Sequence, residues 1–219
     1  MIKTTVRTLV AAALALLPLT AAVTTPAHAA EELSLHDAIE ILPLASESRE
    51  GYDRKKFRHW IDEDRDSCNT RAEVLLAEAI TQPSVGAGCK LTGGTWFSYY
   101  DNTEVQDPSD LDIDHMVPLA ESWDSGASQW TAERRRAFAN DLGAERSLVA
   151  VTARSNRSKA DQDPAEWMPS APDARCTYLA DWVGTKLRWS LTADQRERDT
   201  LRELAAGCED TDAEYEHHQ

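Results

Sequence analysis

The chain has 219 residues and a formal net charge of −15 at pH 7, long enough to bury one substantial core. Its acidic balance makes long-range attraction to phosphate unfavourable and excludes a tight DNA-coating protein.

The first residues are typical of an export signal. Lys3 and Arg7 precede an apolar run from Leu9 to Leu17, and Ala27-His28-Ala29 is a small-x-small cleavage site. We expect cleavage after Ala29, which leaves 219 − 29 = 190 residues with a net charge of −15 − 2 = −17. The apolar run is too short to span a bilayer, and no later run is longer. We expect a secreted, extracellular monomer that does not cross a membrane.

The next third of the chain alternates helical and strand patterns. Residues 33–44 have helical spacing and predict a loosely attached helix, and residues 69–80 predict a second helix. Residues 90–100 look like a strand pair that turns at Gly93-Gly94. Residues 111–117 alternate apolar and polar side chains as a strand does, which places Asp114 and His115 at a strand end.

The rest of the chain is mainly helical. We expect helices in 121–130, 131–140, 178–187 and 192–206, a strand over 147–151, and a short helix that carries Asn156 near its beginning. The acidic residues 209–219 predict a disordered tail. The predicted domains are a signal at 1–29, one folded domain at 30–208 with a core at about 110–165, and the tail.

Four cysteines in an exported chain favour two disulfides. Cys68, Cys89, Cys176 and Cys208 allow three pairings. Pairing within each half, Cys68 with Cys89 and Cys176 with Cys208, would close two modest loops, each adding roughly 3 kcal/mol of stability in the chain-entropy model. Zinc binding is disfavoured because no Cys-x-x-Cys pair exists.

The motif that carries chemistry is Asp114-His115-Met116-Val117-Pro118. Asn156 follows 41 positions after the histidine, in Ser155-Asn156-Arg157-Ser158-Lys159. A carboxylate and a carboxamide are oxygen ligands for a hard divalent ion, and an imidazole can take a proton from water near neutral pH. The run from Arg134 to Lys159 has seven basic and two acidic residues, a local charge of +5 that suits phosphate.

Each of these residues also has an ordinary structural explanation. Asp114 can end a strand, and asparagine is a favoured helix cap. A lone histidine is more often structural than catalytic, which is how we interpret His36 and His59. His115 differs because it adjoins Asp114 and precedes a basic segment with Asn156.

Residues 112–163 resemble the HNH endonucleases, and more narrowly the secreted actinobacterial branch of the DUF1524 (GmrSD-type) family. The resemblance rests on Asp112-Ile113-Asp114-His115-Met116-Val117-Pro118-Leu119 and on the segment from Ser155 through Pro164. It extends more weakly to Cys68-Asn69-Thr70-Arg71, Gly88-Cys89, the Arg134–Asp141 segment and the late cysteines, and so covers most of the 190 residues.

The resemblance implies an α+β fold with a ββα-metal core in a mainly helical domain. It also implies one bound Mg²⁺, Mn²⁺ or similar ion held by Asp114 and Asn156, with His115 as the general base. Arg157, Lys159, Arg154 and Arg71 would hold substrate phosphates, and Asp112 and Asp161 would support the ligands. The chain departs from the family pattern at Ser147, where the family has an asparagine that braces the loop bearing the histidine.

The implied function is a secreted, metal-dependent endonuclease that cleaves DNA, and RNA as a further substrate, with little sequence specificity. An alternative is an extracellular binding protein that retains the HNH shell without catalysis, favoured by Ser147 and by the acidic charge. A different metallo-phosphoesterase is disfavoured because the other histidines and acids lack the clustered spacing of a two-metal site. A serine hydrolase is disfavoured because Gly-x-Ser-x-Gly is absent.

Overall fold

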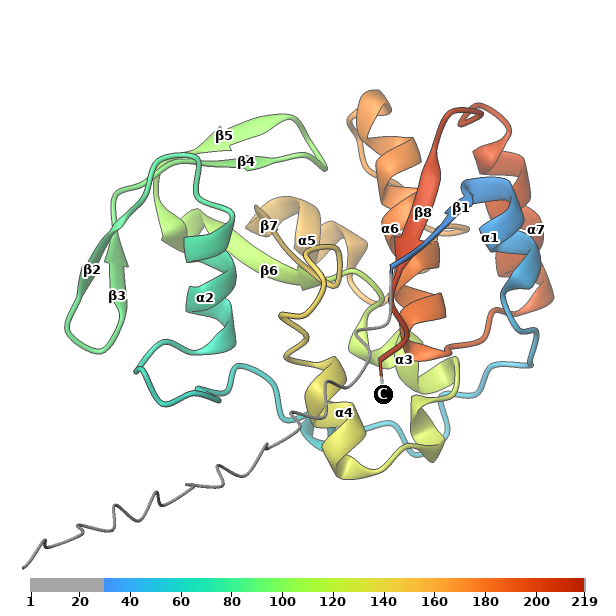
Figure 1. Ribbon diagram of the computed structural model, residues 1–219, viewed down its shortest axis with the longest axis horizontal. Coiled ribbons are helices and arrows are strands. Elements are labelled where there is room, and N and C mark those ends of the chain that lie inside the picture. The colour runs from blue at the N-terminus through green and yellow to red at the C-terminus, as the bar shows by residue number, and fades with distance from the viewer. Residues whose placement is uncertain (1–29, 219) are drawn as a thin grey trace, which may run out of the picture.

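A two-stranded antiparallel unit with a short helix lies at the centre of the fold (Figure 1). The computed structural model describes residues 30–218, so the predicted signal at 1–29 lies outside the described residues. Strand β6 (Leu111–His115) pairs with β7 (Leu148–Thr152), with Leu111 opposite Thr152 and His115 opposite Leu148. Helix α5 (Ala153–Lys159) follows β7 directly, and the Thr152 side chain caps it by accepting from Ser155 N.

The two faces of β6 have different neighbours because strand side chains alternate. Leu111 and Ile113 pack into a small core with residues of α2 (Thr70–Ala77). Asp112 and Asp114 point to the other face, where both bond to side chains of α5. The predicted strands at 111–117 and 147–151 and the helix carrying Asn156 are confirmed.

Two hairpins cover the α2 side of the molecule. β2 (Ser84–Gly86) pairs with β3 (Lys90–Thr92), and β4 (Trp96–Ser98) pairs with β5 (Thr103–Val105). The predicted strand pair across Gly93-Gly94 is therefore wrong. Both glycines have positive φ, but they lead from one hairpin to the next, because the turn at 87–89 already returns the chain onto β2.

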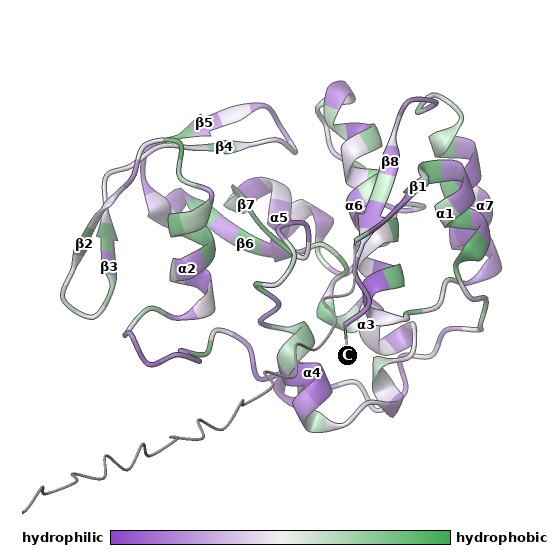
Figure 2. Ribbon diagram, viewed as in Figure 1, coloured by the Kyte–Doolittle hydropathy of each residue, from purple (hydrophilic) through white to green (hydrophobic). Residues whose placement is uncertain are grey.

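The larger core lies between the remaining helices, on which hydrophobic and hydrophilic residues alternate in Figure 2. They are α3 (Leu119–Asp124), α4 (Ala132–Phe138), α6 (Arg175–Trp189) and α7 (Gln195–Ala205). In α6, Trp182 and Trp189 are completely buried. Short 3₁₀ turns occur at Arg54–Lys56, Pro108–Asp110, Ala127–Gln129 and Pro172–Ala174. The helices predicted from 121 onward are confirmed, with shifted ends.

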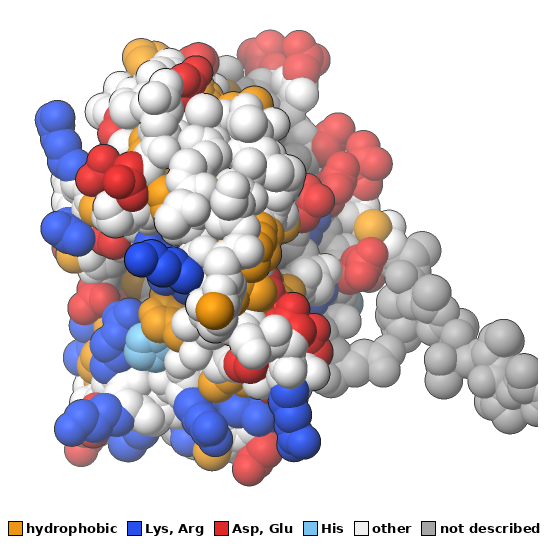
Figure 3. Space-filling view, turned by 90° about the vertical axis from the view of Figure 1, so that its left-hand side faces the viewer, with side chains coloured by type: hydrophobic (Ala, Val, Ile, Leu, Met, Phe, Trp, Pro, Cys, Tyr) orange, Lys and Arg blue, Asp and Glu red, His pale blue; other side chains and the backbone are white. Residues whose placement is uncertain are grey.

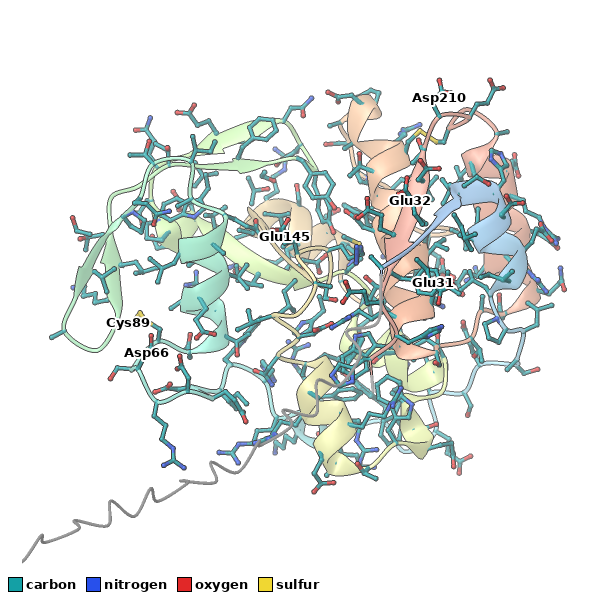
Figure 4. All side chains as sticks on the ribbon, viewed as in Figure 1. Glu31, Glu32, Asp66, Cys89, Glu145 and Asp210 are labelled. Carbon is teal, nitrogen blue, oxygen red and sulfur yellow. A yellow bond between two sulfur atoms is a disulfide. The ribbon has the colours of Figure 1, made fainter. Side chains whose placement is uncertain are left out.

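The two ends of the described chain pair with each other, which corrects two predictions. β1 (Glu31–Ser34) is antiparallel to β8 (Asp212–Tyr215), so the tail predicted to be disordered contains a strand. Ala213 and Tyr215 alternate inward and are buried, which stabilises the strand despite its acidic neighbours. Helix α1 (Leu35–Ile41) is not loosely attached, because Leu35 and Ile39 are buried in the main core. Figure 4 marks Glu31 and Glu32 on β1 alongside β8.

Both disulfides follow the pairing within each half of the chain. Cys68 is bonded to Cys89, and Cys176 to Cys208. Figure 4 shows Cys89 beside Asp66, whose carboxylate accepts a bond from Cys68 N at 2.7 Å. The first disulfide joins the loop before α2 to the β2–β3 hairpin, and the second joins α6 to the turn that follows α7. Within residues 30–218, no helix is both long and apolar enough to cross a membrane.

Candidate active site

Asp114 is buried and held by two side chains. It is 4 % exposed. Its Oδ2 accepts from the Tyr100 hydroxyl at 2.7 Å and from Lys159 Nζ at 2.7 Å. Burial raises the pKa of Asp114, and the positive charge of Lys159 opposes this rise. Asp114 therefore lies in a buried ion pair, with its second oxygen, Oδ1, outside these contacts.

Lys159 is completely buried, so its predicted role in holding substrate phosphates is wrong. Besides Asp114, its ammonium group donates to the carbonyls of His115 and Met116, both at 2.9 Å. These bonds fix the last turn of α5 to the end of β6. The burial of Lys159 could not be predicted from the basic run. It follows from the position of Lys159 on the face of α5 that packs on the strands.

Asn156 is brought into contact with Asp112 rather than with Asp114. Its Nδ2 donates to Asp112 Oδ2 at 3.2 Å, and Arg157 Nε lies 3.3 Å from the same oxygen. From the sequence, Asp112 was expected only to support the ligands. The alternation of β6 places Asp112 and Asp114 on one face, and that signal could have identified Asp112 as a site residue.

Three oxygen atoms on this face are available to a ligand. The Oδ1 atoms of Asp112, Asp114 and Asn156 have no hydrogen-bond partner among the described residues. None of the three is a buried atom, so all are accessible to solvent. Two carboxylates and one carboxamide are hard donors, without sulfur or imidazole. This set fits Mg²⁺, Mn²⁺ or Ca²⁺ better than zinc or copper.

His115 faces the opposite side of β6 and is 6 % exposed. Its Nε2 donates to the Ala139 carbonyl at 3.0 Å, which leaves Nδ1 as the nitrogen with a free lone pair. The ring packs between Trp60, at 5.2 Å, and Phe138, at 6.4 Å. Burial lowers the pKa of His115 to about 3, and the positive charges of Arg54, His59 and Lys159 act in the same direction. The imidazole is therefore neutral at physiological pH.

Asp141 braces the loop that supports His115. Its carboxylate accepts from Arg188 at 2.7 and 2.9 Å, from Trp189 at 2.9 Å and from Ser147 Oγ at 2.7 Å. The Ser147 carbonyl in turn accepts from Met116 N at 3.0 Å. Serine at this position thus takes part in bracing, and the departure from the family pattern leaves the loop well supported.

The predicted phosphate-binding arginines differ in exposure and in the contacts that they already make within the fold. Arg157 has 75 % of its side chain exposed, and Arg154 is exposed at the edge of a cavity of about 270 Å³. One Nη of Arg71 donates to the carbonyls of Pro108 and Leu111, both at 2.9 Å, and the side chain lines a cavity of about 760 Å³. Arg154 and Arg157 are therefore free to meet substrate, while Arg71 is partly engaged in the fold.

The basic run from Arg134 to Lys159 does not form an open basic face. Arg134 donates to the Trp189 carbonyl and Arg135 to the carbonyls of Ala127 and Trp130, while Arg146 pairs with Glu214. A different basic group is exposed at Arg54, Lys55, Lys56 and Arg58. Figure 3 shows Lys and Arg side chains gathered near a histidine on the face that lies at the left of Figure 1.

Two further groups of carboxylates could hold a cation. Glu47, Glu121 and Glu197 lie together near Lys186, whose ammonium contacts Glu121 at 3.0 Å and Glu197 at 2.6 Å and so already offsets part of their charge. Asp62, Asp64 and Asp66 are exposed in the loop before α2. With Glu73 they occupy the first, third, fifth and twelfth positions of a segment, the spacing of acidic ligands in calcium-binding loops.

Comparison with known proteins places these features in a family. The model of the C-terminal domain of GmrSD restriction endonucleases matches residues 50–204, more than half of the chain and all of the β6–β7–α5 unit. The chain belongs to this family. Membership in the GmrSD C-terminal domain family gives it a nuclease-related function, with nucleic acid as the implied substrate and a divalent metal as the implied cofactor.

A relative of the chain is an uncharacterized secreted protein of Arthroderma benhamiae (strain ATCC MYA-4681 / CBS 112371). It is 41 % identical over 160 residues, which cover 73 % of this chain and 77 % of the relative. No solved structure matches the chain. The secreted relative and the two disulfides, which persist in oxidising compartments, confirm that the protein is secreted.

Proposed function

We propose that this protein is a secreted, metal-dependent endonuclease of the HNH type that acts as a monomer. It hydrolyses phosphodiester bonds of DNA, and of RNA as a further substrate, with little sequence specificity. One observation carries the proposal. The β6–β7–α5 unit places Asp112 and Asp114 on the face of β6 that contacts α5, with Asn156 bonded to Asp112, and His115 directly follows Asp114 on the other face.

Asp114 and Asn156 are the proposed ligands of one Mg²⁺ or Mn²⁺ ion, and Asp112 is an additional candidate ligand. Each offers its Oδ1 atom, because the hydrogen bonds of the two aspartates use Oδ2 and that of Asn156 uses Nδ2. When bound, the ion neutralises negative charge on the phosphate and on the departing 3′ oxygen.

His115 is the proposed general base. The Ala139 carbonyl fixes the tautomer, so Nδ1 can accept a proton from water. Burial keeps the ring uncharged at physiological pH, so Nδ1 has the lone pair that a base requires. The water oxygen attacks phosphorus opposite the 3′ oxygen, and the products carry a 5′ phosphate.

Arg154 and Arg157 are the proposed contacts to phosphates on either side of the cleaved bond. Both belong to α5, next to Asn156 in sequence, and both are exposed. Arg71 is a further candidate, from α2. Contacts to phosphate carry no sequence information, which fits cleavage with little specificity.

A purified-protein assay tests the function. Plasmid, linear DNA and RNA are incubated with residues 30–219 in Mg²⁺, Mn²⁺ or EDTA. We expect degradation with either ion and none in EDTA. Asn156→Ala should abolish metal-dependent cleavage. The matched control is Asn102→Gly, at an exposed asparagine with φ of +51° that bonds Asp173, and it should keep cleavage.

The alternative is an extracellular binding protein without catalysis, favoured by the net charge of −15 and by the burial of His115. Retention of labelled DNA in a gel-shift assay, with no cleavage in any ion, would select this alternative. Neither cleavage nor retention would reject both functions.

A further inference from the structure

We propose that His59 is a second catalytic residue of this site and donates a proton to the departing 3′ oxygen. The sequence suggested a structural role for His59. The inference rests on the proposed nuclease function and adds a group to the same site. It is carried by the position of His59 beside His115, by the orientation of its ring and by the way its segment is held.

The two imidazoles are neighbours although 56 positions separate them in the chain. Their ring centroids lie 6.3 Å apart, and Trp60 contacts both rings, at 5.3 Å from His59 and 5.2 Å from His115. In an in-line displacement the attacking and departing oxygens lie on opposite sides of phosphorus. A base and an acid must therefore be two separate groups that lie near each other, as these two rings do.

The His59 ring is oriented for proton transfer. Its Nδ1 donates to the Phe57 carbonyl at 3.0 Å. Nε2 has no hydrogen-bond partner among the described residues. It is not buried, so it is exposed to solvent. The His115 ring is oriented in the same way, because its Nε2 donates to the Ala139 carbonyl.

The segment that carries His59 is clamped to the loop that supports His115. Asn140 Nδ2 donates to the Arg58 carbonyl at 2.7 Å, and Asn140 Oδ1 accepts from Ile61 N at 3.1 Å. Asn140 directly follows Ala139, the residue that holds the His115 ring. One loop therefore sets the positions of both imidazoles.

The backbone next to His59 is held in a costly conformation. Trp60 has φ of +56°, the left-handed region that a bulky residue rarely adopts. Such a conformation persists only where the surroundings enforce it, and it occurs most often at functional sites. Here it places the Trp60 ring against His115 while leaving His59 partly exposed.

The charge around His59 suits an anionic substrate. Arg54, Lys55, Lys56 and Arg58 precede it within five residues and are exposed. In the proposed step, the bond from water oxygen to phosphorus forms and the bond from phosphorus to the 3′ oxygen breaks. The proton of water goes to His115 Nδ1. His59 enters the step with protons on both nitrogens, and the 3′ oxygen receives the one on Nε2 while Nδ1 keeps its bond to Phe57. Both rings then exchange protons with solvent.

Two oligonucleotides of one sequence test this role in Mn²⁺. One has a normal linkage at a single labelled position, and the other has sulfur in place of the 3′ oxygen there. A thiolate leaves without needing a proton, so His59→Gln should slow cleavage of the normal linkage by about 10²-fold or more. It should slow cleavage of the sulfur linkage by less than about threefold. His36→Gln, an exposed histidine of α1, is the matched control and should change neither rate.

Equal slowing of both linkages, or no slowing of either, would overturn the role of His59. Circular dichroism shows whether His59→Gln is folded. If it is not, His59→Ala with added imidazole gives a second test, in which imidazole should restore cleavage of the normal linkage and failure to do so rejects the proposal. A wild-type protein that cleaves neither linkage would instead reject the proposed function.

Discussion

The two aspartates of β6 lie on the same face of the strand but have different environments. Asp112 and Asp114 both pair with a basic residue of α5, but the Asp112–Arg157 pair is largely exposed and the Asp114–Lys159 pair is buried. Exposed pairs are screened by water, whereas a buried charge depends on its partner. The site therefore combines one structural ion pair with one pair that substrate can displace.

Lys159→Met should reduce the free energy of unfolding by roughly 3–5 kcal/mol, because it leaves the Asp114 carboxylate buried without its partner. The matched control is Arg157→Met, in the same helix and also paired with an aspartate of β6. It should change the free energy of unfolding by less than about 0.5 kcal/mol. Urea unfolding followed by tryptophan fluorescence measures both. Equal losses in the two variants would contradict the structural role of Lys159.

His115→Gln should lower the rate of DNA cleavage by about 10²–10⁴-fold, the usual contribution of a general base. Glutamine is the better test than alanine, because its amide can still donate to the Ala139 carbonyl and it fills part of the space between Trp60 and Phe138. Initial rates in Mg²⁺ with the melting temperature of each variant measure this. A folded His115→Gln protein with more than a tenth of the wild-type rate would exclude the base role.

Elements of this fold are joined by buried polar contacts as well as by apolar packing. Glu78, just after α2, accepts from Ala150 N of β7 at 2.9 Å. Asp181 of α6 accepts from Tyr99, just after β4, at 3.2 Å. Burial raises the pKa of each carboxyl to about 7. These contacts add polar links to the apolar packing between elements, and they make stability depend on pH.

Asp181 should make the protein less stable as the pH rises from about 4 to about 7. Its folded pKa of about 7 exceeds the ordinary 3.8. The folded state therefore binds a proton that the unfolded state has released, and the stabilisation present below pH 4 is lost through this window. Melting temperatures across pH 4–8 should fall less for Asp181→Asn than for wild type. Parallel curves for the two proteins would contradict the raised pKa.

Divalent cations should stabilise the loop before α2. Asp62, Asp64 and Asp66 lie close together, and the pKa of Glu73 is raised by partial burial and by these three charges. Because like charges repel, Asp64→Asn should raise the melting temperature in EDTA. Adding Ca²⁺ should raise it for wild type more than for the variant. Arg65→Gln, in the same loop, is the control that keeps all four carboxylates, and an equal calcium effect in Asp64→Asn and wild type would contradict the prediction.

The molecule as a whole is an acidic, disulfide-linked domain around two clusters of buried apolar residues. The β6–β7 pair lies between these clusters, so its two faces contact different parts of the chain. The β1–β8 pair joins the two ends of the described chain and links residues about 180 positions apart. This arrangement holds the site on strands that are packed on both faces.

Removing Cys68–Cys89 by a double alanine substitution should reduce the free energy of unfolding by about 3 kcal/mol, the chain-entropy value for a loop of this size. The Cys176–Cys208 double variant should lose a similar amount. Urea unfolding of the two variants and of wild type measures this. A loss below about 1 kcal/mol for either variant would show that its disulfide adds little to stability.

The sequence by itself determined the features that depend on local pattern. The alternation of 111–117, the apolar run at 147–151 and the helix with Asn156 follow from side-chain periodicity, so this unit could be predicted. The even number of cysteines and the export signal indicated secretion and disulfides. The order of Asp114, His115 and Asn156 indicated the chemistry, because the residue types that hold hard ions and move protons are few.

Only the tertiary structure decided which side chains meet. Whether a basic residue of α5 faces solvent or Asp114 depends on how the helix packs, so Lys159 could not be distinguished from Arg157 by sequence. The β1–β8 pair and the approach of His59 to His115 join residues far apart in the chain. Such contacts depend on burial and on the closing of long loops, so the local sequence pattern does not predict them.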